Sequence, residues 1–254
     1  MYSRKQGTGE PMLVVVQGGD GDADATPVLV EELARDRTVM TYDRRGLSRS
    51  PAGDDPVTIE SHTDDLALLL ATQARGPVDV LGISIGGLIG LDLAARYPGL
   101  VRTVVAYEPP LTQVMDDPEP FVTRQRAVEE AFRAEGVAAA MQRFLALTGF
   151  DPADREPDVE LPRPGPERAA NLAFFLTHDA PAARRFWLYE SPLLAEHVVP
   201  AAGASSRGTS AAAPVEALAK KLGRDLAVFE GGHNAHVLRP RAFAATVRSL
   251  LGYH

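Results

Sequence analysis

Short apolar runs rich in β-branched residues recur along the chain, and turn residues such as glycine, proline and aspartate follow each run. Runs that are apolar throughout are typical of strands buried on both faces of a parallel sheet. The stretches between them place apolar residues at helical spacing, as Leu66, Leu69 and Leu70 do. Strands are therefore predicted at residues 12–16, 37–42, 78–81, 101–107, 197–202 and 226–229, and helices at residues 63–74, 88–96 and 240–251.

This alternation predicts an α/β fold with a mostly parallel sheet and helices on both faces. Residues 111–191 interrupt it, because their pattern predicts only helices around a proline-rich linker at residues 152–166. We expect them to form a helical cap, or lid, over one edge of the sheet, with residues 1–110 and 192–254 as the core. The cap helices are predicted at residues 121–133, 137–147, 169–176 and 182–189.

The composition excludes several classes of protein. Of the 254 residues, 45% are hydrophobic and 24% charged, which is close to the globular average. The absence of cysteine removes thiolate metal sites and thiol nucleophiles. With 26 basic and 34 acidic residues the chain lacks the basic patch of a nucleic-acid-binding protein. No membrane-spanning run or apolar leader is evident, so a cytoplasmic protein is expected.

The segment Gly82-Ile83-Ser84-Ile85-Gly86 carries the clearest chemical signal. It reads Gly-x-Ser-x-Gly between a predicted strand and a predicted helix, which is the setting of a nucleophile elbow. A sharp turn there raises the serine hydroxyl above the sheet, and the helix N-terminus beside it can stabilise a developing oxyanion. Ser84 is therefore the candidate nucleophile, and an idle serine in a glycine-rich turn is the alternative.

A serine nucleophile needs a base, and His233 is the best placed of the six histidines. It follows the last predicted strand in the segment Glu230-Gly231-Gly232-His233, where paired glycines allow a tight loop over the strand ends. The chain order, serine first and histidine last, also fits. His236 lies close enough to compete, but a structural role is favoured for it.

These segments together resemble the α/β-hydrolase fold superfamily over nearly the whole chain. The chain is particularly similar to small actinobacterial-type serine hydrolases with a helical cap, which read Tyr-Asp-Arg-Arg-Gly and later Glu-Pro-Pro. The resemblance implies a mostly parallel sheet of about eight strands, and its motifs are specific to the fold rather than to a substrate. The matching segments are Gln17-Gly18-Gly19, residues 42–46, the turn at Ser84, Arg96-Tyr97-Pro98 and the loop at His233.

The chain departs from this family at two places. The family usually has one or two strands before the run at Met12, whereas only a short segment precedes it here. We therefore expect abridged N-terminal strands, with a remnant strand within residues 2–5. The family also carries an aspartate after the next-to-last strand, but residues 203–207 read Gly-Ala-Ser-Ser-Arg and contain no carboxylate.

Glu108 is the candidate for the missing acid. It ends the strand at residues 101–107, and some members of the fold take their acid from this position. A carboxylate there can accept the imidazole N–H of His233 and stabilise the imidazolium. Two alternatives stay open: a structural glutamate that anchors the Pro109-Pro110 turn, and a serine–histidine pair that works without an acid.

The oxyanion hole is predicted to use the backbone N–H groups of Gly19 and Ile85. Gln17 occupies the position where the family usually has histidine, a change that leaves a backbone donor intact. Asp20, Asp22 and Asp24 have the spacing of a calcium loop without its closing glutamate, so a solvated loop that caps a helix at residues 27–33 is the preferred interpretation. No metal site, phosphate loop or dinucleotide fingerprint is predicted, and no cofactor is expected.

These residues favour a serine hydrolase, acting as a monomer or homodimer, that cleaves a small or medium ester, lactone, thioester or amide through an acyl-enzyme. A lyase or cyclase on the same fold stays open, as does a ligand-binding protein on a retired hydrolase scaffold. A covalent serine adduct would distinguish the serine hydrolase from the lyase or cyclase and from the ligand-binding protein. We expect most of the aromatic residues of the cap to form the cap's own core and the rest to line an apolar pocket. These aromatic residues are Phe121, Phe144, Phe174, Phe175, Phe186 and Trp187.

Overall fold

The computed structural model describes residues 1–161, 165–189, 191 and 194–253. These residues contain one seven-stranded sheet in the order β1-β3-β2-β4-β5-β6-β7, in which β1 is antiparallel to β3 and all other neighbours are parallel. The mostly parallel sheet is confirmed, with seven strands where about eight were expected. The strands are β1 (Ser3–Gln6), β2 (Leu13–Val16), β3 (Val39–Tyr42), β4 (Val78–Ile83), β5 (Val101–Tyr107), β6 (Val198–Gly203) and β7 (Ala227–Phe229).

The first strand overlaps the predicted remnant at residues 2–5. β1 pairs with β3 at the edge of the sheet, with Ser3 opposite Tyr42. It is the one strand that the described residues contribute before β2.

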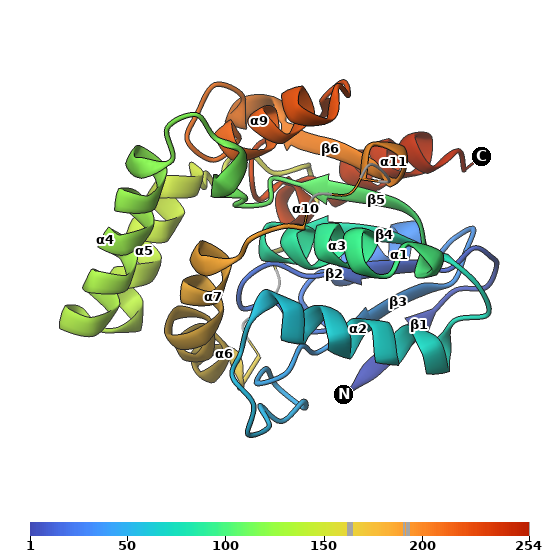
Figure 1. Cartoon of the computed structure of the whole chain (residues 1–254), viewed down its shortest axis with the longest axis horizontal. Helices are drawn as coiled ribbons and strands as arrows, with labels where there is room; N and C mark the ends of the chain where they lie inside the picture. The colour runs from blue at the N-terminus through green and yellow to red at the C-terminus, as the bar shows by residue number, and fades with distance from the viewer. Residues whose placement is uncertain (162–164, 190, 192–193, 254) are drawn as a thin grey trace.

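Helices cover both faces of the sheet (Figure 1). On one face, α2 (Ile59–Gln73), α3 (Ile85–Arg96) and α9 (Ala213–Leu222) pack in one apolar cluster with alternate strand residues such as Val80 and Val104. On the other face, α1 (Pro27–Leu33) and α11 (Pro240–Leu251) pack on the opposite set, which includes Leu81 and Val105. Because both faces are covered, β2 and β4 are buried at every position.

Two core helices begin earlier than predicted. α2 starts at Ile59 because Thr58 and Ser61 form a capping box, each side chain bonding the other's backbone N–H. α3 starts at Ile85, directly after Ser84, rather than at Leu88. The predicted start was wrong because the glycines in the first turn of α3 look like loop residues in the sequence.

The segment between β5 and β6 is helical, and we refer to residues 111–191 as the helical insertion. It contains α4 (Glu119–Glu135), α5 (Val137–Thr148), α6 (Arg168–Phe174), the π-helix η3 (Phe175–Asp179) and α7 (Ala180–Arg185). The last predicted helix was wrong at both ends, since α7 stops at Arg185 and Phe186 is extended. The predicted linker has neither helix nor strand in its described part, and its residues 162–164 lie outside the described residues.

The topology brings the candidate site residues to one edge of the sheet. The chain runs outward from β2 to β3 and then returns to place β4 on the other side of β2. Ligands of open α/β sheets bind at the carboxyl ends of the strands beside such a reversal. The loops that follow β2 and β4 carry Gly19 and Ser84, and the insertion lies beside this edge (Figure 1). Within the described ranges, no helix is both long and apolar enough to cross a membrane.

Candidate active site

Ser84 lies on a strained turn between β4 and α3. Its φ of 53° and ψ of −118° are unusual for a residue with a side chain. Its backbone N–H donates to the carbonyl of Tyr107 at 2.8 Å, which ties the turn to the neighbouring strand β5. Position 86 must be glycine because a Cβ there would overlap the carbonyl oxygen of Val16 on the other neighbouring strand. A Cβ at position 82 would likewise overlap the Gly86 carbonyl oxygen, so the elbow requires glycine two residues before and two residues after Ser84.

The structure brings His233 and Glu108 together. His233 follows β7, Glu108 follows β5, and the His233 Nδ1 atom lies 2.6 Å from the Glu108 Oε2 atom. Glu108 is 1% exposed and His233 8% exposed. Glu108 has a φ of 44°, so it and Ser84 are two of the four non-glycine residues with positive φ in the described part of the chain. Backbone strain of this kind is commonly found at functional sites.

The turn that lacks the family's aspartate holds Glu108 instead. The backbone N–H of Gly203 donates to Glu108 Oε1 at 2.9 Å, and the Ser206 hydroxyl also hydrogen-bonds the carboxylate. Burial alone would raise the pKa of Glu108, but the His233 ring and these two donors lower it below its ordinary value. An ionised carboxylate only accepts, so it fixes the proton of His233 on Nδ1 and leaves Nε2 free to act as a base.

Ser84 and His233 line two adjoining pockets. The apolar pocket lies between the core and the insertion, and most of its lining is aliphatic or aromatic. The wide pocket lies over the loop after β2 and reaches α5 and α6. Phe144 and Phe175 line both pockets, with ring centroids 5.9 Å apart. A substrate bound at Ser84 can place one substituent on each side of these rings.

The predicted oxyanion donors belong to residues that line the two pockets. Gly19 lines the wide pocket and Ile85 lines the apolar pocket. Neither backbone N–H donates a hydrogen bond to another described residue, since Ile85 opens α3 and Gly19 lies in a loop. Gln17 is turned away to bond Thr26 through its Nε2 atom, at 2.7 Å. Both N–H groups are thus available to an oxyanion.

Arg44 of the Tyr-Asp-Arg-Arg-Gly motif holds the loop containing Gly19 and is itself held by Asp179. Arg44, which is buried, donates to the carbonyls of Gln17 at 2.8 Å and of Gly18 at 3.1 Å, and also to that of Gly19. Its ion-pair partner is Asp179 of η3, at 3.1 Å, which in turn accepts from His62 at 3.0 Å. The sequence offered one signal for this contact, the Tyr-Asp-Arg-Arg-Gly motif, but no signal for Asp179.

The other histidines have other roles. His62 bonds Asp179, and His197 bonds the Arg102 carbonyl at 2.9 Å. His178 lies against Phe174. Burial lowers the pKa of His236 to about 3, with a further contribution from His233, so His236 stays neutral and is a poor base. Of the insertion aromatics, Phe121, Phe144 and Phe175 line the apolar pocket, while Phe186 is buried in the core cluster and Trp187 is 71% exposed.

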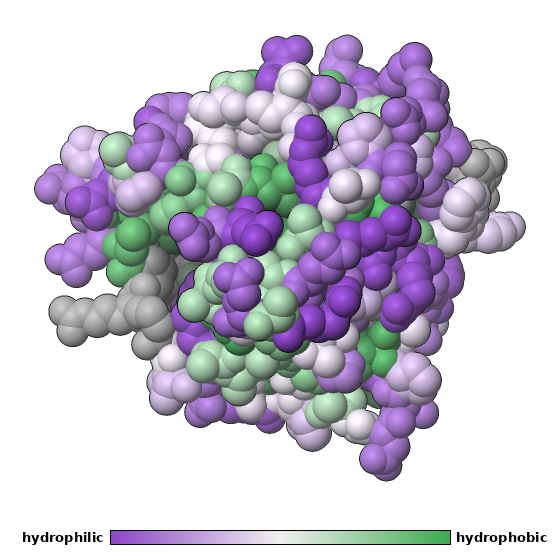
Figure 2. Space-filling model, turned by 90° about the vertical axis from the view of Figure 1, so that its left-hand side faces the viewer, coloured by the Kyte–Doolittle hydropathy of each residue, from purple (hydrophilic) through white to green (hydrophobic). Residues whose placement is uncertain are grey.

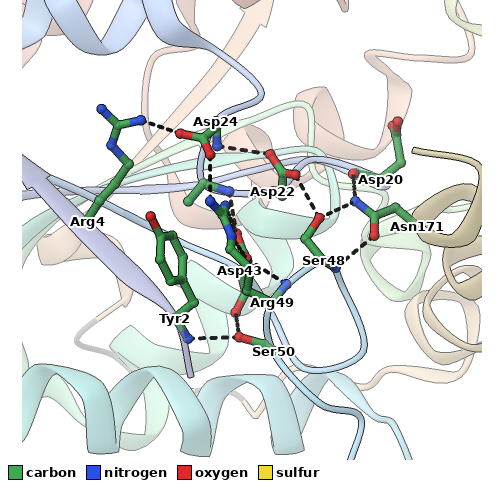
Figure 3. A network of polar contacts seen from close by, with 11 residues as sticks. Tyr2, Arg4, Asp20, Asp22, Asp24, Asp43, Ser48, Arg49, Ser50 and Asn171 are labelled. Carbon is green, nitrogen blue, oxygen red and sulfur yellow. Dashed lines mark hydrogen bonds and ion pairs between the residues drawn. The ribbon is translucent and has the colours of Figure 1, made fainter. Parts of the chain in front are cut away.

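The three aspartates after Gly19 form a polar network rather than a metal cage (Figure 3). Asp22 accepts from the Ser48 hydroxyl at 2.7 Å, and Asp24 pairs with Arg4 and Arg49. No group of three or more metal-ligating side chains occurs among the described residues. The helix-capping interpretation was wrong, because Thr26 caps α1 without a side-chain hydrogen bond. Asp22 and Asp24 instead bond the loop at residues 43–50, and the Asp20 side chain pairs with α6.

Asn171 of α6 joins the same network. Its Oδ1 accepts from the Ser48 N–H at 2.9 Å, and its Nδ2 donates to the carbonyl of Asp20 (Figure 3). Arg168, one turn earlier, pairs with the Asp20 side chain at 3.1 Å. The α6–η3 part of the insertion is thus bonded to the loops that surround the site.

Comparison with known proteins places the chain in a family. Residues 11–154 match the model of the alpha/beta hydrolase fold. The chain is 29% identical over 264 residues to the Bacillus subtilis protein named uncharacterized hydrolase YraK, covering 99% of this chain and 92% of that protein. It is 32% identical over 233 residues to lipase LipV of Mycobacterium tuberculosis, covering 84% and 83% of the two chains.

A solved structure shows the same fold. The enol-lactonase from Burkholderia xenovorans LB400 superposes with a TM-score of 0.73 at 24% identity, covering 99% of this chain and 96% of that one. The two folds therefore correspond over nearly the whole length of both chains, and identity at this level shows the fold alone. From the family model and the sequence relatives, the chain belongs to the alpha/beta hydrolase fold family.

Proposed function

We propose that the chain is a serine hydrolase that cleaves a small or medium ester, lactone, thioester or amide through an acyl-enzyme. The observation that carries this proposal is the 2.6 Å contact between His233 and Glu108, on a histidine that lines both pockets with Ser84. The hydrolase, lipase and lactonase names of the relatives support it.

In the proposed reaction, His233 Nε2 takes the proton of the Ser84 hydroxyl as the oxygen attacks the substrate carbonyl. The positive charge that forms on the imidazole is stabilised by the Glu108 carboxylate, which is already ionised and held by Gly203 and Ser206. The negative charge on the carbonyl oxygen is taken by the N–H groups of Gly19 and Ile85. His233 then protonates the leaving group and activates the water that releases the acyl group.

The test is covalent labelling of the native chain. A fluorophosphonate probe followed by peptide mass mapping should modify Ser84, and Ser84→Ala should abolish both the label and hydrolysis of p-nitrophenyl esters. His233→Ala should fall to a similar residual rate, because such residues act as a unit. Absence of a Ser84 adduct together with normal ester turnover in Ser84→Ala would reject the mechanism.

The setting of the reaction is part of the same proposal. We expect a small-molecule substrate, a cytoplasmic location and a monomer or homodimer. The division into a core of residues 1–110 and 192–254 and a cap of residues 111–191 also belongs here. The contacts of α6 and η3 with the site loops support a cap that contributes to the active site. Residues 190, 192 and 193, at the predicted boundary, lie outside the described residues.

A further inference from the structure

Helix α4 supplies two polar side chains to the apolar pocket. Gln125 and Glu129 are four residues apart and therefore share one face of the helix, which also carries Phe121. The core contributes Ser84, Ile85 and His233 to the lining of the same pocket. The outer surface on the α4–α5 side mixes hydrophilic and hydrophobic residues in the usual way (Figure 2). Two polar side chains turned inward, among aliphatic and aromatic neighbours, need a separate explanation.

The inward position of Glu129 is explained by an ion pair within the protein. It is buried, and its carboxylate forms an ion pair with Arg184 of α7. Arg184 does not line the pocket, so its guanidinium neutralises the charge from behind while the carboxylate stays at the pocket wall. The pocket thus gains hydrogen-bond acceptors without gaining a strong net charge, which disfavours a charged ligand group.

The inward position of Gln125 has no such explanation among its contacts with the described residues. Its Oε1 atom is buried and accepts no hydrogen bond from any described residue. A buried acceptor without a partner is destabilising in the free protein, whereas an apolar side chain of the same shape would be neutral or favourable at that place. A group that costs stability and lines the same pocket as the candidate nucleophile is expected to serve a ligand.

We assign the acyl group of the substrate to the apolar pocket. The wide pocket, which is more polar and lies over the loops at Gly19 and Ser48, suits a departing group and the entry of water. The apolar pocket is lined by Phe121, Val128 and Leu147, which suits a chain that stays attached to Ser84 while water attacks.

We propose that Gln125 is a specificity-determining residue and that the preferred acyl group carries a hydrogen-bond donor, a hydroxyl or amide N–H, beyond an apolar stretch. This inference rests on the proposed function and narrows its substrate class. The Gln125 Oε1 atom then accepts a hydrogen bond from the acyl group when substrate is bound. An acyl chain that ends in a methyl group leaves the acceptor unpaired, and sites built around a hydrogen bond discriminate strongly against such analogues.

The experiment compares p-nitrophenyl esters of straight-chain acids with esters of the same length that end in a hydroxyl or a methyl ketone. With the native chain, kcat/KM should favour the hydroxyl ester at one chain length by about tenfold or more over the methyl ester, and also over the ketone, which only accepts. Gln125→Leu should bring the hydroxyl-to-methyl ratio close to one. Gln142→Leu, the same change at an exposed position of α5, should leave the ratio at the native value.

Thermal unfolding provides a second measurement. If Gln125 serves the substrate, Gln125→Leu should keep or raise Tm, whereas a structural glutamine would lower it. Equal ratios in the native chain and in Gln125→Leu, with esters still cleaved, overturn this inference and leave the proposed function standing. A preference for the ketone ester also overturns it. Failure of all esters, with no label on Ser84, rejects the proposed function itself.

Discussion

The core wall and the insertion wall of the active site are held in different ways. On the core side, Ser84, Glu108 and His233 follow β4, β5 and β7, and backbone hydrogen bonds and strained turns set their positions. On the insertion side, helices are held by ion pairs and packed rings. The core residues, whose relative positions must be precise for the proposed chemistry, lie on rigid elements. The insertion residues, which would contact the substrate, lie on elements that can shift.

The insertion itself has two parts. The α6–η3 part is bonded to the site loops through Arg44–Asp179 and Asn171–Ser48, and the Phe175 ring packs on Gly19, where a Cβ would meet it at 2.9 Å. Among the described residues, the α4–α5 hairpin makes one longer polar bond to a site loop, from Asn234 Nδ2 to the Thr148 hydroxyl at 3.4 Å. It is held by a small apolar cluster around Val128 and Phe175 and by the Glu129–Arg184 pair. We therefore expect the first part to govern rate and the second to govern selectivity.

The largest expected effect lies on the core wall. Glu108→Gln should keep the fold but lower kcat by about 10³- to 10⁴-fold, because an amide can stabilise the wrong tautomer of His233; the corresponding change in a serine protease costs about 10⁴-fold. KM should change little. The measurement is steady-state kinetics on a p-nitrophenyl ester, with circular dichroism to verify the fold.

Ser206 offers a rescue of that variant. Its hydroxyl bonds the Glu108 carboxylate, so adding Ser206→Asp to Glu108→Gln returns a carboxylate to the turn where the family usually has one. The double variant should recover part of the lost kcat. If Glu108→Gln stays within about threefold of the native kcat, about 0.6 kcal/mol, Glu108 is not the acid.

The core wall could be predicted from the sequence because its residues mark the ends of strands. The elbow glycines and the Glu108-Pro109 turn each follow an apolar run, and parallel strands bring such ends to one edge. Asp179 could not be predicted, since it is 135 residues from Arg44 and lies on a π-helix that looks like ordinary helix in the sequence. The position of Gln125 depends on how α4 packs, which helical periodicity alone does not specify.

The second effect tests the bonded part of the insertion. Asp179→Asn leaves the buried Arg44 without its counter-ion, so the carbonyls of the Gly19 loop should lose their fixed positions. We expect kcat to fall by about tenfold or more, with a smaller change in KM. This loss should be smaller than the 10²- to 10³-fold loss that follows deletion of an oxyanion donor. Affinity for a trifluoromethyl ketone, which mimics the tetrahedral intermediate, should fall in parallel with kcat.

A neighbouring ion pair is the control for this experiment. Arg45 bonds Asp65 at 2.6 and 2.8 Å, but this pair is only partly buried and does not touch the Gly19 loop. Asp65→Asn should therefore leave kcat near the native value and lower Tm less than Asp179→Asn does. An equal loss of kcat in both variants, or a loss of Tm alone in Asp179→Asn, would show that Asp179 does not position the loop.

The third prediction concerns motion within the insertion. A lid must open, so we expect the insertion to be more mobile than the sheet, and the contacts confine this expectation to the hairpin. Amide hydrogen exchange should be fastest in α4 and α5, slower in α6 and η3, and slowest in β4, because few bonds must break for the hairpin to open. Protection of α4 equal to that of β4 would contradict a hinged hairpin, and equally fast exchange in η3 would remove the distinction between the two parts.

The smallest effect is on stability at acid pH, where one carboxylate on each wall contributes. Burial alone would raise the pKa of Glu108 and of Asp179, but His233 in the first case, and His62 and Arg44 in the second, lower both below their ordinary values. A carboxylate whose folded pKa is depressed stabilises the fold above its unfolded pKa, and this stability is lost as the pH falls through the folded pKa. Tm should therefore decline from about pH 5 downward, since the unfolded pKa values lie near 4. Glu108→Gln and Asp179→Asn should each flatten this decline. Identical slopes in the native chain and in both variants would mean that the partners of the two buried carboxylates do not lower their pKa, and the contrast between the two walls would then rest on packing alone.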